Sequence, residues 1–199
     1  DVVFDRSDNA LEFADNAKAK FGADADLEVY HDGSHSYLLE NGTGDLKIET
    51  NGTAIQLGKS NGEVCAKFIP DGSVELYEDN VKKFETASGG VSLTGGAAAN
   101  ITALSDGATI TIDMATACHH SVTLGGNRTF AAPSNQAVGQ AGSIFITQDG
   151  TGSRTASFNS AFKFVGGTAP TLTTGAGLTD RIDYIILSSN VIHCAVSLD

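Results

Sequence analysis

The sequence predicts an all-β protein, on the strength of its turn spacing, its hydrophobic pattern and its composition. Turn-forming pairs recur every nine or ten residues in the first half of the chain: Asp32-Gly33, Asn41-Gly42, Asn51-Gly52, Asn61-Gly62 and Asp71-Gly72. Between these pairs apolar and polar residues alternate, which is the period of a strand with one face toward a core. Pro occurs 3 times, Met once and Trp not at all, whereas Gly occurs 23 times. We therefore expect strands joined by glycine-rich turns.

Each turn pair predicts a reversal of the chain. Asn-Gly and Asp-Gly accept positive φ at both central positions of the two-residue turns that suit hairpins. The strands expected between the turns carry their alternating apolar residues at 27–30, 46–49, 55–57, 64–68 and 74–76. A ribbon this narrow cannot bury its apolar face against itself. We therefore expect copies of the same chain to cover that face.

The first 22 residues favour strands over a helix. Residues 9–20 contain good helix formers, and Asp8 is placed to cap them. However, residues 11–18 align, with a gap of one residue, with 27–33 and 74–84 as copies of one unit: strand, Asp-Gly or Asp-Asn turn, strand. A repeated unit that cannot bury its own face indicates stacking into an elongated object. The repeat predicts a shaft of hairpins over residues 1–95.

The charge changes along the chain and marks a domain boundary. Residues 1–95 hold 18 acidic and 8 basic residues, a net of −10, whereas residues 96–199 hold 6 and 4, a net of −2. Small residues around Gly95-Gly96 suit a joint. An acidic surface repels phosphate groups, so nucleic acid is a poor partner. The sequence predicts a shaft at 1–95 and a separate domain, the tip, at 96–199.

The sequence of residues 96–199 predicts that the tip is a β-sandwich. Six strands are expected, at residues 109–113, 121–124, 142–148, 154–158, 181–187 and 191–198. Glycine-rich loops separate them, as at 149–153 and 166–170. Short strands with turn signals between them are typical of a sandwich or a barrel.

Two regions carry a family resemblance. Residues 21–37, 42–48 and 74–86 resemble the repeat of tail-fibre-like virion proteins of marine bacteriophages, especially cyanophages, although Phe84 stands where that repeat usually has Leu. Residues 142–154 and 162–172 resemble the C-terminal domain common at the ends of phage fibres. The resemblance implies a homotrimer located in the virion, in contact with other virion proteins.

The function implied is that of a structural fibre protein, a tail fibre or adhesin that attaches to a host surface glycan or protein. One alternative is a capsid decoration or head fibre protein without a receptor role. A less favoured alternative is a tailspike that degrades glycans. Exposed polar loops of the tip would carry a receptor, and the candidate receptor-binding residues are Gln148, Asp149, Thr151, Ser153, Arg154, Thr168 and Thr171.

No motif in the sequence predicts an enzyme, a metal or a cofactor. No nucleophile elbow, phosphate loop or catalytic triad order is recognisable, and residues 24–28 lack the glycine and the closing glutamate of a calcium loop. His31 and His35 are expected on an exposed loop. Cys65, Cys118 and Cys194 are expected as buried thiols. No apolar run reaches the length of about 18 residues that a membrane span needs, so no membrane insertion is expected.

Overall fold

The computed structural model describes all residues from 1 to 199. β-strands are the main regular elements in both halves of the chain. The only helical element is a single 3-10 turn, η1 (Val165–Gly167). Residues 9–20 contain no helix, so the prediction of strands there and the all-β class are both confirmed. The chain divides into an N-terminal unit, Asp1–Gly95, and a C-terminal unit, Gly96–Asp199.

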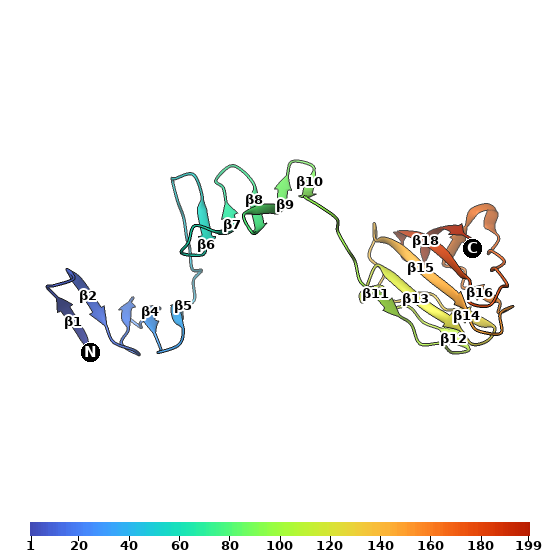
Figure 1. The fold of residues 1–199 in the computed structure, drawn as a ribbon, viewed down its shortest axis with the longest axis horizontal. Helices are drawn as coiled ribbons and strands as arrows, with labels where there is room; N and C mark the ends of the chain where they lie inside the picture. Colours follow the sequence, from blue (N-terminus) through green and yellow to red (C-terminus); the bar gives the residue numbers. More distant parts are fainter. The chain divides into compact units, whose positions relative to one another are not determined.

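The N-terminal unit consists of three separate antiparallel sheets (Figure 1). The first pairs β1 (Val2–Asp5) with β2 (Ala10–Phe13). The second has the order β3 (Ala19–Phe21), β4 (Leu27–His31), β5 (Ser36–Glu40). The third is a meander in which each strand pairs with the next: β6 (Ile55–Gly58), β7 (Val64–Phe68), β8 (Val74–Glu78), β9 (Val81–Ala87) and β10 (Gly90–Leu93).

Three of the five predicted turn pairs connect paired strands. The pairs at 32–33, 61–62 and 71–72 join β4 to β5, β6 to β7 and β7 to β8. Gly33 and Gly62 adopt φ of 98° and 91°, which side chains with a Cβ rarely accept. Between β8 and β9 the turn residues Asp79 and Asn80 both have positive φ, 49° and 61°, as a type I′ hairpin turn requires.

The predicted strand around Leu46 and Ile48 is wrong. Residues 41–54 form no strand, and the turn pairs at 41–42 and 51–52 connect no hairpin. This segment links β5 to β6, which are edge strands of two different sheets, so no neighbouring strand is available to pair with it. Side chains bond the local backbone instead, because Glu40 accepts a hydrogen bond from the amide of Gly42 and Thr50 from that of Gly52.

The C-terminal unit contains two sheets. One has six strands in the order β11 (Ile101–Ala103), β13 (His119–Leu124), β15 (Ala141–Gln148), β18 (Thr179–Ser188), β19 (Val191–Ser197) and β17 (Phe162–Phe164). The other has three, β12 (Thr109–Ile110), β14 (Arg128–Phe130) and β16 (Ala156–Phe158). From β11 to β16 the chain alternates between the two sheets. Strands of successive turns therefore pair in parallel, as in a coil.

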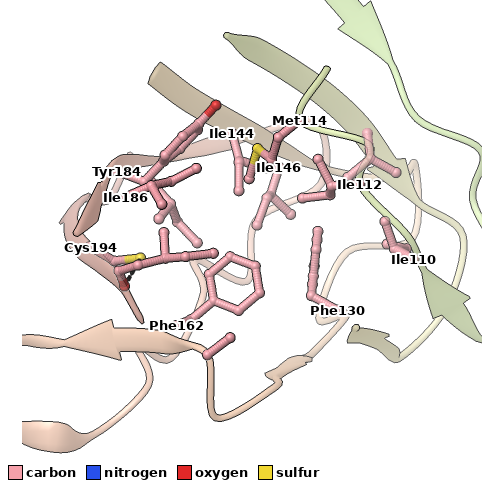
Figure 2. Close-up of a cluster of buried hydrophobic side chains, with 14 of the residues drawn as sticks. Ile110, Ile112, Met114, Phe130, Ile144, Ile146, Phe162, Tyr184, Ile186 and Cys194 are labelled. Atoms are coloured by element: carbon pink, nitrogen blue, oxygen red, sulfur yellow. Dashed lines mark hydrogen bonds between the residues drawn. The ribbon is translucent and has the colours of Figure 1, made fainter. Parts of the chain in front are cut away.

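The core of the molecule lies between these two sheets (Figure 2). Ile110 and Phe130 reach it from the three-stranded sheet, and Ile144 and Ile146 from the six-stranded sheet, all with at most 1% of their surface exposed. Phe130 and Phe158 are register partners on adjacent turns, and their rings stack with centroids 4.9 Å apart. The coil thus aligns residues far apart in sequence into ladders of buried side chains.

The six strands predicted for this half all overlap observed strands. Sequence reasoning missed β11, β14 and β17, which are only three residues long each. It also gave no sign of the parallel pairing. By contrast, Ala66 is the only buried hydrophobic residue of the N-terminal unit.

Candidate receptor-binding surface

Three loops of the coil lie beside one another in the C-terminal unit. They follow β11, β13 and β15 and comprise residues 104–108, 125–127 and 149–155. Because β11, β13 and β15 are parallel neighbours, their C-terminal ends meet at one edge of the sheet. Hydrogen bonds link the loops, since the amide of Gly125 donates to Asp106 at 3.2 Å and that of Arg128 to the carbonyl of Thr155 at 2.9 Å. We call these three loops the loop edge.

An ion pair fixes the first two loops of the loop edge to each other. Arg128 donates from Nε to Oδ1 of Asp106 at 2.7 Å and from Nη2 to Oδ2 at 2.5 Å. This two-pronged geometry is the strong form of an Arg–carboxylate contact. The guanidinium of Arg128 lowers the pKa of Asp106 below its usual value. The sequence alone does not indicate this ion pair, because nothing local connects two charges 22 positions apart.

A second ion pair closes the third loop. Oδ1 of Asp149 accepts the backbone amides of Thr151 and Gly152, both at 2.9 Å, and Arg154 donates to Oδ2 from Nη2 at 2.7 Å. The bonded Arg154 guanidinium, helped by these amides, lowers the pKa of Asp149 to about 2. Gly152 has φ of 72°, and a Cβ there would lie 2.5 Å from the carbonyl oxygen of Thr174. Only glycine therefore fits at this point of the loop.

Gln148 anchors the same loop from inside. Its side chain is 3% exposed, and its amide donates to the carbonyls of Arg154 at 3.0 Å and Thr173 at 2.8 Å. Its side-chain oxygen accepts the amide of Arg154 at 2.8 Å. Nearby, Ser153 donates its backbone amide to Thr174 at 2.9 Å. The structure therefore brings together the two loops predicted to carry a receptor, residues 148–154 and 166–174, and gives Gln148 an internal role in joining them.

Asp180 holds the second of these loops in the same way. This carboxylate is 2% exposed and accepts the amide and hydroxyl of Thr173 at 2.8 and 2.7 Å. It also accepts the amide of Asp199 at 3.1 Å. Because all of these donors belong to the backbone or to neutral groups of the same unit, Asp180 acts as a structural anchor.

The seven predicted residues divide by exposure. Thr151, Ser153, Thr168 and Thr171 are exposed, whereas Asp149 and Arg154 are half-buried and bonded to each other. Thr168 lines a separate hollow of about 240 Å³ with Phe164, Val165, Pro170, Cys194 and Val196. Among the seven predicted residues, those exposed at the loop edge are thus Thr151 and Ser153, beside other exposed polar residues such as Ser105, Asn127 and Thr155.

The carboxylates of the loop edge are poorly suited to glycan hydrolysis. A glycosidase needs one carboxyl group with a raised pKa that stays protonated and acts as the acid. Asp106 and Asp149 are both bonded to an Arg, and both have a lowered pKa. They remain ionised at neutral pH and are matched in charge by Arg128 and Arg154, which leaves the loop edge close to neutral.

The histidines and cysteines differ in their surroundings. His31 and His35 are both exposed, as predicted, but only His35 lies in the loop, because His31 is the last residue of β4. His120 is fully buried, and neither of its ring nitrogens has a hydrogen-bond partner.

Cys194 is buried, and burial raises the pKa of its thiol to about 11. The prediction of three buried thiols is wrong for Cys118, which is half-buried, and for Cys65, which is exposed because no second layer covers its sheet.

One group of carboxylates could hold a metal ion. The carboxylates of Asp5, Asp8 and Glu12 lie within 4.8 Å of one another, and two of these residues are exposed. Exposed acidic groups often cluster without binding an ion, and no other observation points to a ligand here. In the segment that partly imitates a calcium loop, Glu28 is instead bonded to Lys18 at 2.7 Å.

None of the chain's elements is a helix long and apolar enough to cross a membrane. The comparisons with known proteins leave the family open. No protein-family model, no curated protein and no solved structure matches the chain significantly.

Proposed function

We propose that this chain is a structural fibre protein of a phage virion, a homotrimer that attaches to a host surface through its C-terminal unit. The contrast between the two units is the observation that carries the proposal. The C-terminal unit has a complete core of its own, whereas Ala66 is the only buried hydrophobic residue in the N-terminal 95 residues. A repetitive segment that needs other copies, joined to a self-sufficient domain, suits a fibre with a binding end.

The loop edge is the proposed attachment surface. Its loops are tied down by the ion pairs Asp106–Arg128 and Asp149–Arg154, so little conformational entropy is lost on binding. The exposed groups include several hydroxyls and the Asn127 amide, and the two carboxylates are each paired with an Arg, which suits a polar, uncharged ligand such as a surface glycan. Rigid elements that present polar loops are a common way to build a binding site.

Binding of the complete chain to an array of bacterial surface polysaccharides tests the proposal. We expect retention on a subset of glycans, and we expect the double variant Thr151→Ala with Ser153→Ala to bind at least about tenfold more weakly. The matched control is Thr129→Ala with Ser157→Ala, which removes a hydroxyl pair on the three-stranded sheet. A chain that binds no glycan or host cell would contradict attachment and support a decoration role, whereas shortening of a polysaccharide would support a tailspike.

A further inference from the structure

The five-stranded sheet of the N-terminal unit has one largely apolar face, which carries the charged residue Glu78 at its edge, at the end of β8. Residues directly opposite each other in antiparallel strands point to the same side, and the register of β6 to β10 gathers one set of such partners. This set, which we call the apolar face, is Ile55, Leu57, Ala66, Phe68, Val74, Leu76, Phe84, Thr86, Val91 and Leu93. It extends over all five strands.

The opposite face is polar and is covered by its own side chains. Glu75 is only 8% exposed, because Lys82 lies 3.1 Å away and the hydroxyls of Tyr77 and Ser73 also bond to it. Lys67 sits over the ring of Tyr77, 5.5 Å from its centroid. The isolated chain therefore shelters charged groups and leaves leucines in water, the reverse of what burial favours.

Exposure confirms that the unit leaves the apolar face open. Leu57, Leu76 and Leu93 expose 55%, 45% and 51% of their surface, and Val91 exposes 62%. No other sheet of the unit pairs with β6 or β10. A layer of this kind has no stable core by itself, because the burial of apolar area is the main favourable term in folding.

The second sheet likewise has a buried charged group on one face and exposed apolar residues on the other. Glu28 is buried between Lys18 and Lys20, at 2.7 and 3.3 Å, on one face of β3, β4 and β5. On the other face, Val29 and its register partner Leu38 are exposed. Whatever covers this unit must therefore offer apolar surface at more than one sheet of the repeat.

The exposed area is large enough for such contacts. The chain has 12,584 Å² of accessible surface, whereas two compact monomeric domains of half its mass would together expose about 10,700 Å². The excess of roughly 1,900 Å² is about twice the 800 Å² that each partner buries in a standard stable interface. The chain as a whole thus exposes more surface than two compact domains would, by more than one partner's share of a standard interface.

We infer that the apolar face is the surface through which copies of this chain contact one another. A copy fits because it presents the same apolar strips in the same repeat. It also fits electrostatically, since the N-terminal unit carries a net charge of −10 but the listed residues of the apolar face are uncharged, and Glu78 lies only at the edge of that side, at the end of β8. Copies can meet over the listed residues while most of their carboxylates lie elsewhere. This inference rests on the homotrimer of the proposed function and specifies the contact surface.

Two substitutions in one strand test the inference. Leu57→Glu places a carboxylate on the apolar face of β6, whereas Gln56→Glu places one on its exposed opposite face. We expect sedimentation equilibrium of the complete chain to give wild type and Gln56→Glu the same oligomer mass. We expect Leu57→Glu to associate at least about tenfold more weakly, because the burial of a leucine is replaced by that of a charge.

A second readout separates lost association from lost folding. The core of the C-terminal unit contains none of the substituted residues, so slow labelling of buried Cys194 reports that this unit is intact. In wild type we also expect oxidative footprinting to show that Leu76 and Leu93 are protected at high but not at low protein concentration.

Equal association of both variants, or a monomeric wild type, would overturn the inference. A dimer would support the apolar face and contradict the homotrimer, and an oligomer that binds no host would contradict only attachment.

Discussion

Arg154 locks Asp149 in place by donating two hydrogen bonds to the same carboxylate oxygen, 3.0 Å from Nε and 2.7 Å from Nη2. Because two backbone amides of the loop bond to the other oxygen, one side chain sets the shape of residues 149–154. Thr151 and Ser153 are therefore held out toward solvent by contacts that do not involve a ligand.

Arg154→Ala is expected to raise the pKa of Asp149 from about 2 toward its usual 3.8. The folded-state pKa is depressed, so the carboxylate stabilises the fold above about pH 4 and this contribution is lost as the pH falls toward about 2. A titration of the Asp149 carboxyl by NMR measures the shift. Arg181→Ala, which removes another Arg–Asp pair, is the control and should leave Asp149 unchanged. A value still near 2 in Arg154→Ala would show that the amides alone suffice.

Gln148→Ala should destabilise the C-terminal unit by about 1–3 kcal/mol, because it leaves the half-buried carbonyls of Arg154 and Thr173 without their donor. The shift in the midpoint of urea unfolding measures the loss. Thr151→Ala, at an exposed position of the same loop, should stay within about 0.5 kcal/mol of wild type. Equal effects of the two changes would contradict the anchoring role of Gln148.

The stability of the C-terminal unit should decrease as the pH falls below about 6.5. Burial lowers the pKa of His120 from its usual 6.5 and outweighs the backbone of Ala117, which favours the charged form. The unfolded chain therefore takes up the proton first, and stability present above pH 6.5 is lost on acidification. Urea unfolding at about pH 7.5 and about pH 5.5 measures this loss. His120→Leu should reduce the pH dependence and His35→Gln, at an exposed site, should not. An unchanged slope in His120→Leu would assign the effect to other groups.

The thiols should react in the order of their exposure. Cys65 is exposed, whereas Cys194 is buried and has a pKa of about 11, so little thiolate is available at neutral pH. Alkylation followed by peptide mass spectrometry should label Cys65 rapidly and Cys194 only after unfolding. Cys65→Ser should abolish the fast phase. Rapid labelling of Cys194 in the folded chain would contradict the core described for this unit.

Local chemistry explains which predictions from the sequence were confirmed. Asp and Asn tolerate positive φ and Gly has no Cβ, so the turns at 32–33 and 71–72 are determined by the residues that form them. The pair at 51–52 has the same chemistry but connects no strands, because a strand also needs a partner and Leu46 has none. Turn type is a local property, whereas strand pairing is not.

The parallel coil could not be predicted for the same reason. Its pairs join residues such as Phe130 and Phe158, 28 positions apart, and its shortest strand, β12, has two residues. Gln148 was predicted at the surface because polar side chains usually lie there. It is buried because the backbone carbonyls of two loops require its donors. Only the folded arrangement reveals that requirement.

The mass of the complete wild-type chain at micromolar concentration tests the central claim most directly, which is that the N-terminal unit depends on other copies of the chain. Native mass spectrometry should give three times the 20.5 kDa of one chain. A single species of 20.5 kDa in which the strands of the N-terminal unit resist hydrogen exchange would contradict it.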